Sequence, residues 1–230
     1  MGARERRERE REQRKNDILD TARALLFEKG LHATTINQIA KRAELSVGTI
    51  YFYYDSKEDL YAALQLEGLE ILGGMIREAG LASSSPEEKI RAIARVYLRF
   101  SLEHNNYFEI IDYFLSSPET IFSQDLKTRI DGQGNRSVAV LAEAVAEGIG
   151  TGLFREVDPR TQAIILWGTL HGMLHFRKLQ RTILADVDHE TVYMEAVEHF
   201  INGLRQPQCP ADEMSAPLSL NTGRKHNAKH

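Results

Sequence analysis

From residue 18 onward, apolar residues in this chain recur three and four positions apart. In the first such stretch, Ile18, Ala22, Leu25 and Leu26 fall on a single face of a helix. No segment shows the sustained apolar–polar alternation of a half-buried strand. Apolar residues make up 42% of the 230 residues and charged residues 27%, which is typical of globular proteins rather than disordered or fibrous ones. We therefore predict an all-α fold.

Charge and cysteine content exclude several protein classes. The net charge of −4 excludes a surface that is basic all round, although it leaves room for a local basic face. The single cysteine, Cys209, excludes an intrachain disulfide and a cysteine-based metal site. The chain shows no secretory signal and no run of 18 apolar residues. We expect a soluble cytoplasmic protein without a membrane partner.

The two ends of the chain differ from the rest in composition. Residues 1–15 hold seven basic and four acidic side chains, and we treat residues 1–12 as a charged N-terminal arm. Its alternating charges suit a solvated helical extension, but an arm that contacts DNA phosphates or a minor groove is also possible. Residues 206–230 hold three prolines and no apolar stripe, so we predict a disordered tail.

Two short predicted helices form a helix-turn-helix over about residues 35–54. Thr35 and Gln38 have the spacing of a capping box, which indicates that a helix begins at Ile36. After a tight turn, Ser46 is placed to cap a second helix over 47–54. This arrangement is typical of DNA-binding proteins. We predict a three-helix DNA-binding domain over residues 13–60.

The second of these helices has the chemistry to read double-stranded DNA. Gly48 and Thr49 are small, so the start of the helix can approach a major groove closely. The hydroxyls of Tyr51 and Tyr53 can reach phosphates. The next helix begins near Lys57, and the free N–H groups at its start can also bind phosphates. Four aromatic residues in a row, 51–54, cannot all face inward, so we expect at least two to be exposed. The predicted DNA-binding residues are Thr35, Ser46, Gly48, Thr49, Tyr51, Phe52, Tyr53 and Lys57.

Segments 34–43 (TTINQIAKRA) and 46–60 (SVGTIYFYYDSKEDL) resemble the tetracycline-repressor (TetR) family of bacterial regulators. The resemblance implies that the predicted residues other than Phe52 lie at the DNA face, with phosphate contacts from Thr35, Tyr51 and Lys57. Two positions depart from the family pattern. Glu44 stands where the turn glycine is usual, so the turn must accept a side chain or differ in geometry. Tyr54 replaces the usual phenylalanine and brings a hydroxyl to the edge of the small core.

The resemblance also implies that residues 61–205 form a helical domain that binds a small effector and holds a homodimer together, for about nine helices in all. We expect a helix over about 56–79, in which Gly73-Gly74 marks close packing, an early end or a soft spot. After Pro118 we expect a long helix interrupted at residues 132–134 and ending at residues 148–152. The last two helices, over about 159–180 and 189–205, should form a four-helix bundle with their two-fold mates.

Aromatic residues of this second domain suggest a cavity for a lipophilic or aromatic effector. His171 and His175 have the i,i+4 spacing that can chelate a metal, but no third ligand is evident. We interpret them as core or interface histidines, or as polar contacts to a ligand, and predict no metal site. Ordinary core packing is the alternative for each cavity residue. The predicted lining comprises Tyr97, Phe100, Phe108, Tyr113, Phe114, Trp167 and His171.

Together these features predict a homodimeric regulator of transcription, a repressor that a small effector releases from a palindromic operator. No phosphate-binding loop, metal cluster or activated nucleophile supports an enzyme, and we expect no cofactor. The alternative is a helical DNA-binding protein without an effector, architectural or controlled by a partner. A fully packed second domain would favour that alternative, whereas an empty cavity would favour the effector-controlled regulator.

Overall fold

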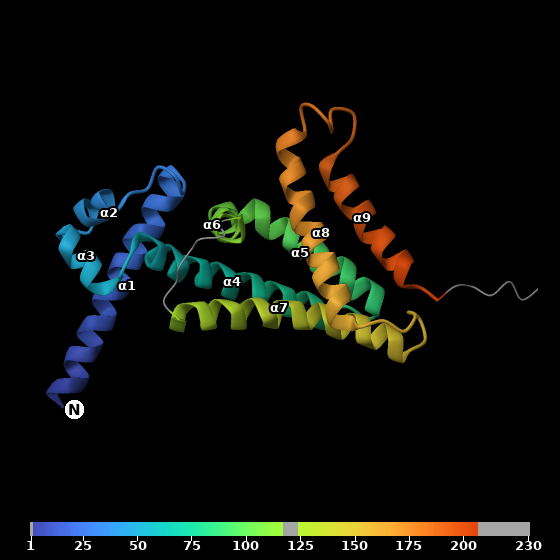
Figure 1. The fold of residues 1–230 in the computed structure, drawn as a ribbon, viewed down its shortest axis with the longest axis horizontal. Helices are drawn as coiled ribbons and strands as arrows, with labels where there is room; N and C mark the ends of the chain where they lie inside the picture. The colour runs from blue at the N-terminus through green and yellow to red at the C-terminus, as the bar shows by residue number, and fades with distance from the viewer. Residues whose placement is uncertain (1, 117–123, 207–230) are drawn as a thin grey trace, which may run out of the picture.

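The computed structural model describes residues 2–116 and 124–206, and within these ranges the chain is all-α, as predicted (Figure 1). The described residues form nine α-helices and a short 3₁₀ helix at Arg177–Leu179, and no strand. None of the described helices is long and apolar enough to cross a membrane. The helices are α1 (Ala3–Lys29), α2 (Ile36–Arg42), α3 (Val47–Tyr53), α4 (Lys57–Ala82), α5 (Pro86–Glu103), α6 (Asn105–Ser116), α7 (Gln124–Gly150), α8 (Pro159–Phe176) and α9 (His189–Leu204).

Helices α1, α2 and α3 pack around a small core together with the start of α4. The fully buried side chains of Ile18, Leu26, Ile39, Ile50 and Leu60 lie at its centre. Local capping sets where the short helices begin, since an N-cap oxygen satisfies N–H groups that have no partner within the helix. The helix-turn-helix therefore forms where the sequence predicts it.

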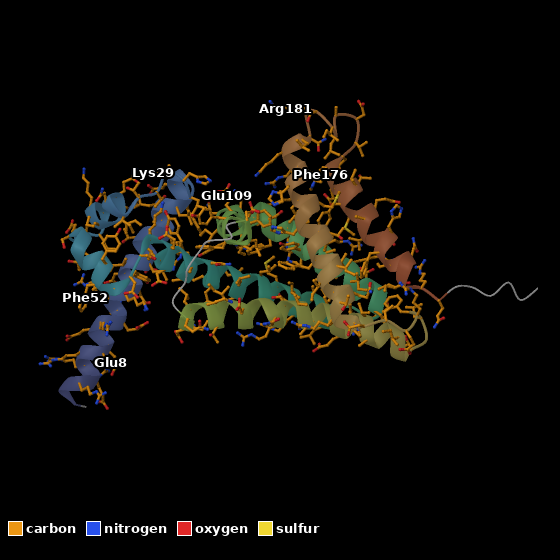
Figure 2. All side chains as sticks on the ribbon, viewed as in Figure 1. Glu8, Lys29, Phe52, Glu109, Phe176 and Arg181 are labelled. Carbon is orange, nitrogen blue, oxygen red and sulfur yellow. The ribbon has the colours of Figure 1, made fainter. Side chains whose placement is uncertain are left out.

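The charged N-terminal arm is the first part of α1, which continues without a break from Ala3 to Lys29. It projects away from the rest of the molecule, with Glu8 near its free end (Figure 2). The arm is thus a helical extension, and a contact between it and DNA stays a prediction.

Helix α4 connects the small core to the larger core of the second domain. Tyr61 and Leu64 belong to the small core, whereas Leu66, Leu69 and Leu72 belong to the large one. The predicted boundary between residues 60 and 61 therefore falls inside a continuous helix. Any displacement of α4 would act on both domains.

Helix α7 is continuous, so the predicted interruption at residues 132–134 is wrong. Gln133 is buried, and its Nε2 lies 3.0 Å from where a Cβ on Gly73 would stand. Helices α4 and α7 lie side by side (Figure 1), and the missing side chain at Gly73 leaves room for Gln133. This contact supports the close-packing interpretation of Gly73, and α4 runs past both glycines to Ala82.

The loop after α7 is anchored to the end of the described chain. Gly152 has φ 73°, which suits glycine, and Phe154 packs against Gly148 so closely that a Cβ there would clash. A single β-bridge pairs Phe154 with Arg205 at the end of α9. Helices α8 and α9 then stand beside each other at one end of the molecule (Figure 1). The predicted disordered tail lies, from residue 207 on, outside the described residues.

Candidate DNA-binding surface and effector cavity

The start of the recognition helix α3 is held by two hydroxyls. Ser46 Oγ accepts a hydrogen bond from the backbone N–H of Thr49 at 3.0 Å and lies 2.8 Å from Thr49 Oγ1. At Thr35, the predicted capping box is present, with Gln38 N–H donating to Thr35 Oγ1 and Thr35 N–H donating to Gln38 Oε1. Ser46 and Thr35 therefore have structural roles in addition to any contact with DNA.

The turn between α2 and α3 keeps a left-handed backbone although it lacks glycine. Glu44 has φ 55°, the one positive φ at a non-glycine position among the described residues. An L-residue in this region places its Cβ too close to the backbone, at a cost of about 1–2 kcal/mol. Of the two possibilities that the sequence left open, the turn accepts the side chain and its strain.

Exposed aromatic side chains mark the outer face of α3. Tyr51 is 46% exposed and Phe52 67%, in line with the expectation that at least two aromatic residues face outward. Phe52 is labelled beside α3 in Figure 2. The guanidinium of Arg11, on α1, lies 5.7 Å from the centre of the Phe52 ring. Gly48, next to them, would meet no atom closer than 3.7 Å if it carried a Cβ, so this surface is open.

Tyr53 and Tyr54 hold the other end of α3. Tyr53 is partly buried and packs edge-on against Phe52, whereas Tyr54 is buried. The Tyr54 hydroxyl donates to the backbone carbonyl of Lys15 at 3.2 Å, and burial raises the pKa of this phenol above its ordinary value. The extra hydroxyl thus ties the end of the recognition helix to α1. Lys57 follows at the start of α4, with its Nζ 4.9 Å from the centre of the Tyr61 ring.

The second domain contains an apolar cavity of about 440 Å³. Its wall is formed by residues of α4, α5, α6, α7 and α8, mostly aliphatic, among them Leu69, Ile93, Ile111, Leu141 and Leu170. Arg160 and Asn135 stand together on the same wall, where Arg160 donates to the Asn135 side-chain oxygen at 2.8 Å. The volume lies in the range of small-molecule sites, about 300–1,000 Å³.

Two of the seven predicted lining residues, Tyr97 and Trp167, lie on the wall of this cavity. The other five lie elsewhere. Phe100 is fully buried and stacks on His104, while Phe108 packs against Tyr97 and His171. Tyr113 and Phe114 pack against the small core, and His171 stands behind Tyr97, whose hydroxyl lies 2.7 Å from its Nδ1.

Gln65 is a polar residue on the cavity wall that is not among the predicted lining residues. Gln65 of α4 is 5% exposed, and its Oε1 makes no hydrogen bond with the described residues. A buried amide oxygen without a partner is costly, and an effector that donates to it would remove that cost. The available signal was a glutamine between Leu64 and Leu66, on a helix that is otherwise apolar there.

Helix α6 connects the apolar cavity with the DNA-binding domain. Ile111 lies on the cavity wall, and its neighbour Ile110 is fully buried in the small core. The hydroxyl of Tyr107 donates to Glu67 Oε2 at 3.0 Å, and Glu67 pairs through both oxygens with Arg23 of α1 at 2.7 and 2.9 Å. Burial and the nearby Glu67 carboxylate raise the pKa of Tyr107 to about 12. A shift of α6 would therefore reach α1 through both apolar and polar contacts.

Asp112 of α6 joins the two histidines of α8. Its Oδ1 lies 2.9 Å from His175 Nε2 and 3.4 Å from His171 Nε2. Helical spacing alone shows no third metal-binding group beside these histidines, because Asp112 is remote from them in the chain. We refer to Asp112, His171 and His175 as the Asp112 cluster.

The outer face of α8 is apolar and contains small residues. Ile165 is 49% exposed and Phe176 41%, and Gly168 and Gly172 lie between them. A Cβ on either glycine would meet no atom of the chain within 4 Å. Phe176 lies toward the far end of the helix (Figure 2). Another helix could approach this stripe closely.

Comparison with known proteins follows the same division into two domains. Residues 18–64 match the model of the bacterial regulatory proteins of the tetR family, and residues 90–200 match that of the tetracyclin repressor-like C-terminal domain. The HTH-type transcriptional repressor KstR2 of Mycobacterium tuberculosis H37Rv is 25% identical over 142 residues, which are 62% of this chain and 70% of the relative.

Two solved structures share the fold. The transcriptional regulator FadR from Bacillus subtilis in complex with stearoyl-CoA has a TM-score of 0.62 at 21% identity, over 82% of this chain and 98% of the other. AibR in complex with isovaleryl coenzyme A and operator DNA has a TM-score of 0.57 at 22% identity, over 81% and 97%. With both domain models matched in order along one chain, the protein belongs to the TetR family of bacterial transcriptional regulators and is not an enzyme.

Proposed function

We propose that this regulator is a homodimeric, cytoplasmic repressor whose apolar cavity takes a fatty acyl thioester and which then leaves a palindromic operator. The observation that carries the proposal is the cavity itself, about 440 Å³ with mostly aliphatic walls. Its wall includes Ile111 of α6, and α6 also contributes Ile110 to the small core of the DNA-binding domain. Helix α6 would thus contact a ligand in the cavity on one side and the small core that carries the recognition helix α3 on the other.

The chemistry of the cavity favours a ligand with an apolar chain and a polar end. Aliphatic side chains fill most of the wall, and its polar side chains are those of Gln65, Asp131, Asn135, Ser137 and Arg160. An acyl chain would bury methylene groups at about 0.8 kcal/mol each. The guanidinium of Arg160 would attract a phosphate or carboxylate. The acyl-CoA complexes of FadR and AibR add support for this class of ligand in this fold.

The mechanism follows from differential affinity for two conformations. An acyl chain that displaces Ile111 would move α6, and Tyr107 would carry that movement through Glu67 to Arg23 on α1. The operator requires two recognition helices about 34 Å apart. A ligand-favoured conformation with a different spacing would bind the operator more weakly.

The direct test measures operator release by acyl-CoA compounds of increasing chain length. The operator comes from selection of bound fragments of sheared genomic DNA at about 150 mM salt, where non-specific binding is weak. We expect an enriched palindrome, and release at an acyl-CoA concentration that falls about fourfold per added methylene until the cavity is full. Release that is independent of chain length would contradict the proposed ligand class, and an operator that no acyl-CoA releases would favour a DNA-binding protein without an effector.

A matched pair of variants tests whether the effector occupies this cavity. Gly134 lies on the cavity wall, and a Cβ there meets no atom within 4 Å, so Gly134→Leu would fill space without a clash at Cβ. Gly132, two residues earlier on α7, has equally free space at Cβ but does not line the cavity. We expect Gly134→Leu to weaken acyl-CoA release at least tenfold and Gly132→Leu to leave it unchanged, with operator affinity retained in both.

A further inference from the structure

We propose that the Asp112 cluster is a binding site for a divalent transition-metal ion, Zn²⁺ in the first instance, which cross-links α6 to α8. Two imidazole nitrogens and one carboxylate oxygen converge there, and all three ligand atoms lie within 4.8 Å of one another. The site is distinct from the apolar cavity, because none of the three residues lines that cavity.

The distances between the ligand atoms suit a tetrahedral ion. Bonds of about 2.0–2.2 Å at tetrahedral angles place neighbouring ligand atoms about 3.3–3.6 Å apart. His171 Nε2 lies 3.4 Å from Asp112 Oδ1, and His175 Nε2 lies 2.9 Å from it. His171 and His175, at i,i+4 on α8, have ring centres 5.2 Å apart and ring planes inclined by 79°. Small side-chain rotations would equalise the three separations around a central ion.

Asp112 Oδ1 lies at ion-pair distance from both histidines. Asp112 Oδ1 is buried, yet it makes no hydrogen bond in proper geometry with the described residues, although two imidazole nitrogens lie close to it. A buried carboxylate oxygen that faces two Nε2 atoms is placed as a metal ligand would be. Asp112 is thus a second observation, independent of the spacing of the histidines, that points to a cation.

A partner on the far side of His171 would orient its ring for metal binding. The Tyr97 hydroxyl lies 2.7 Å from His171 Nδ1, which leaves Nε2 to face Asp112. Metal-binding histidines commonly use their second nitrogen in this way, and loss of such a partner costs about 10–100-fold in metal affinity. Tyr97 also lines the apolar cavity, so the metal site and the cavity share a residue.

Geometry and access at the cluster permit an ion to bind. His171 and His175 each present Nε2 to Asp112 Oδ1, so the three ligand atoms face one another without any rearrangement of the helices. The side chain of His171 is 16% exposed, that of Asp112 23% and that of His175 37%. This exposure leaves an entry path for the ion and room for a water molecule as fourth ligand. Two imidazoles and a carboxylate favour zinc and its first-row neighbours over Mg²⁺ or Ca²⁺.

The test is a metal titration of the full chain after chelator treatment, in the absence of effector and DNA. Cys209, His226 and His230 lie outside the described residues and can bind metals themselves, so every protein carries Cys209→Ser, His226→Ala and His230→Ala. Zn²⁺ binding is measured by competition with a chromogenic chelator, and Co²⁺ binding by its visible absorption bands. Trp167, the sole tryptophan, lies 6.1 Å from His171 between ring centres, so Co²⁺ at the site should quench its fluorescence.

We expect one equivalent of Zn²⁺ to bind and to raise the Tm. His171→Gln, His175→Gln and Asp112→Asn should each weaken the affinity at least 100-fold and abolish the Co²⁺ quenching. Tyr97→Phe should weaken it about tenfold, as expected for loss of a ligand-orienting partner. The matched control is His199→Gln, because His199 also pairs with a carboxylate, Glu195 at 3.3 Å, but on an exposed surface without a second histidine.

Two results would overturn the site. One is a parent protein that binds no Zn²⁺, or whose Zn²⁺ affinity falls as much with His199→Gln as with the substitutions in the Asp112 cluster. The other is Zn²⁺ binding that survives Asp112→Asn and both histidine substitutions with unchanged affinity. Far-ultraviolet circular dichroism of each variant verifies its helical content, so a loss of binding is not confused with unfolding. The measurement needs neither acyl-CoA nor operator, and its outcome is therefore independent of the proposed effector.

Discussion

The hydroxyl of Tyr97 and Nδ1 of His171 lie 2.7 Å apart and join α5 to α8 behind the wall of the apolar cavity. Tyr97 is 3% exposed, and burial raises the pKa of its phenol, so the hydroxyl keeps its proton at any ordinary pH. Its ring lines the cavity while its oxygen holds His171 of the Asp112 cluster. One side chain thus connects the apolar cavity with the candidate metal site.

Tyr97→Phe should destabilise the protein through this single contact. The substitution leaves the ring in place but leaves His171 Nδ1 without its partner, at a cost of about 0.5–1.5 kcal/mol. The measurement is urea unfolding of metal-free protein at pH 7.5. Tyr51→Phe removes an exposed hydroxyl from α3 and serves as the control, with an expected change close to zero. Equal stability of the Tyr97→Phe variant and the parent would show that the contact contributes nothing.

Glu87 should make stability depend on acidity, because its carboxylate is held in the ionised form. Arg205 donates to both of its oxygens, at 2.7 and 3.0 Å, and this contact lowers the pKa of Glu87 below its ordinary value. A carboxyl group with a lower pKa in the folded state stabilises the protein above its unfolded pKa, about 4.3. That contribution is lost as the pH falls through the folded pKa.

Glu87→Gln should therefore be less stable than the parent at pH 7, and the difference should shrink as the pH falls below about 4.3. Urea unfolding at a series of pH values measures it. Glu143→Gln, on the exposed face of α7, is the control. A difference between the parent and Glu87→Gln that stays constant from pH 7 to acid would contradict the role of the carboxylate charge.

The helix-turn-helix could be predicted from the sequence because its determinants are local. Thr35 caps α2 and Ser46 caps α3 through hydrogen bonds to residues three positions away, and such contacts are visible as spacing in the sequence. Helix α1 could be predicted in the same way, because its apolar residues recur at helical spacing. The interruption predicted in α7 failed because it weighed two glycines alone, whereas Gln133 between them gains a tertiary contact at Gly73.

The cavity wall could be predicted only in part because it depends on how the helices pack together. Phe114 and Ile111 lie on the same amphipathic helix α6, yet Ile111 faces the cavity and Phe114 does not line it. The pairing of Asp112 with His175 likewise depends on where α6 passes α8. Helical spacing identifies an apolar face but does not say which neighbour it meets.

Glu44→Gly should stabilise the DNA-binding domain. Glycine removes the left-handed strain at φ 55°, about 1–2 kcal/mol, and adds about 0.5–1 kcal/mol of chain entropy to the unfolded state. The expected net gain is about 0.5–1 kcal/mol in urea unfolding. Glu44→Ala keeps the Cβ and hence the strain, so it should stay close to the parent. A glycine variant less stable than the alanine variant would show that the turn is not strained.

Tyr51→Phe should weaken operator binding without changing stability. The exposed hydroxyl is placed to donate to a phosphate, and a hydrogen bond to a charged group is worth about 1.5 kcal/mol or more. We expect the operator Kd to rise about tenfold in fluorescence anisotropy. Unchanged affinity would remove Tyr51 from the DNA-binding residues.

Ser46→Ala provides the contrast, because Ser46 also caps α3. Loss of the cap should cost about 1 kcal/mol of stability in addition to any loss of operator affinity. Urea unfolding and anisotropy on the same preparations separate the two effects. A Ser46→Ala variant with parental stability would mean that the cap is not needed to form the recognition helix.

Gly172→Lys should convert the proposed homodimer into monomers. The stripe of Gly168 and Gly172 between Ile165 and Phe176 allows close approach of a partner helix, and a lysine there would place a bulky charge in the interface. Because a Cβ at Gly172 meets no atom within 4 Å, the protomer itself should fold as before.

Light scattering after gel filtration measures the mass of the Gly172→Lys protein. Gly132→Lys, on α7 and with equally free space at Cβ, is the control and should remain dimeric. Since two half-sites must be bound at once, the monomer should also lose the palindromic operator while its circular dichroism stays helical. A Gly172→Lys protein that keeps the mass and operator affinity of the control would place the dimer interface on another surface.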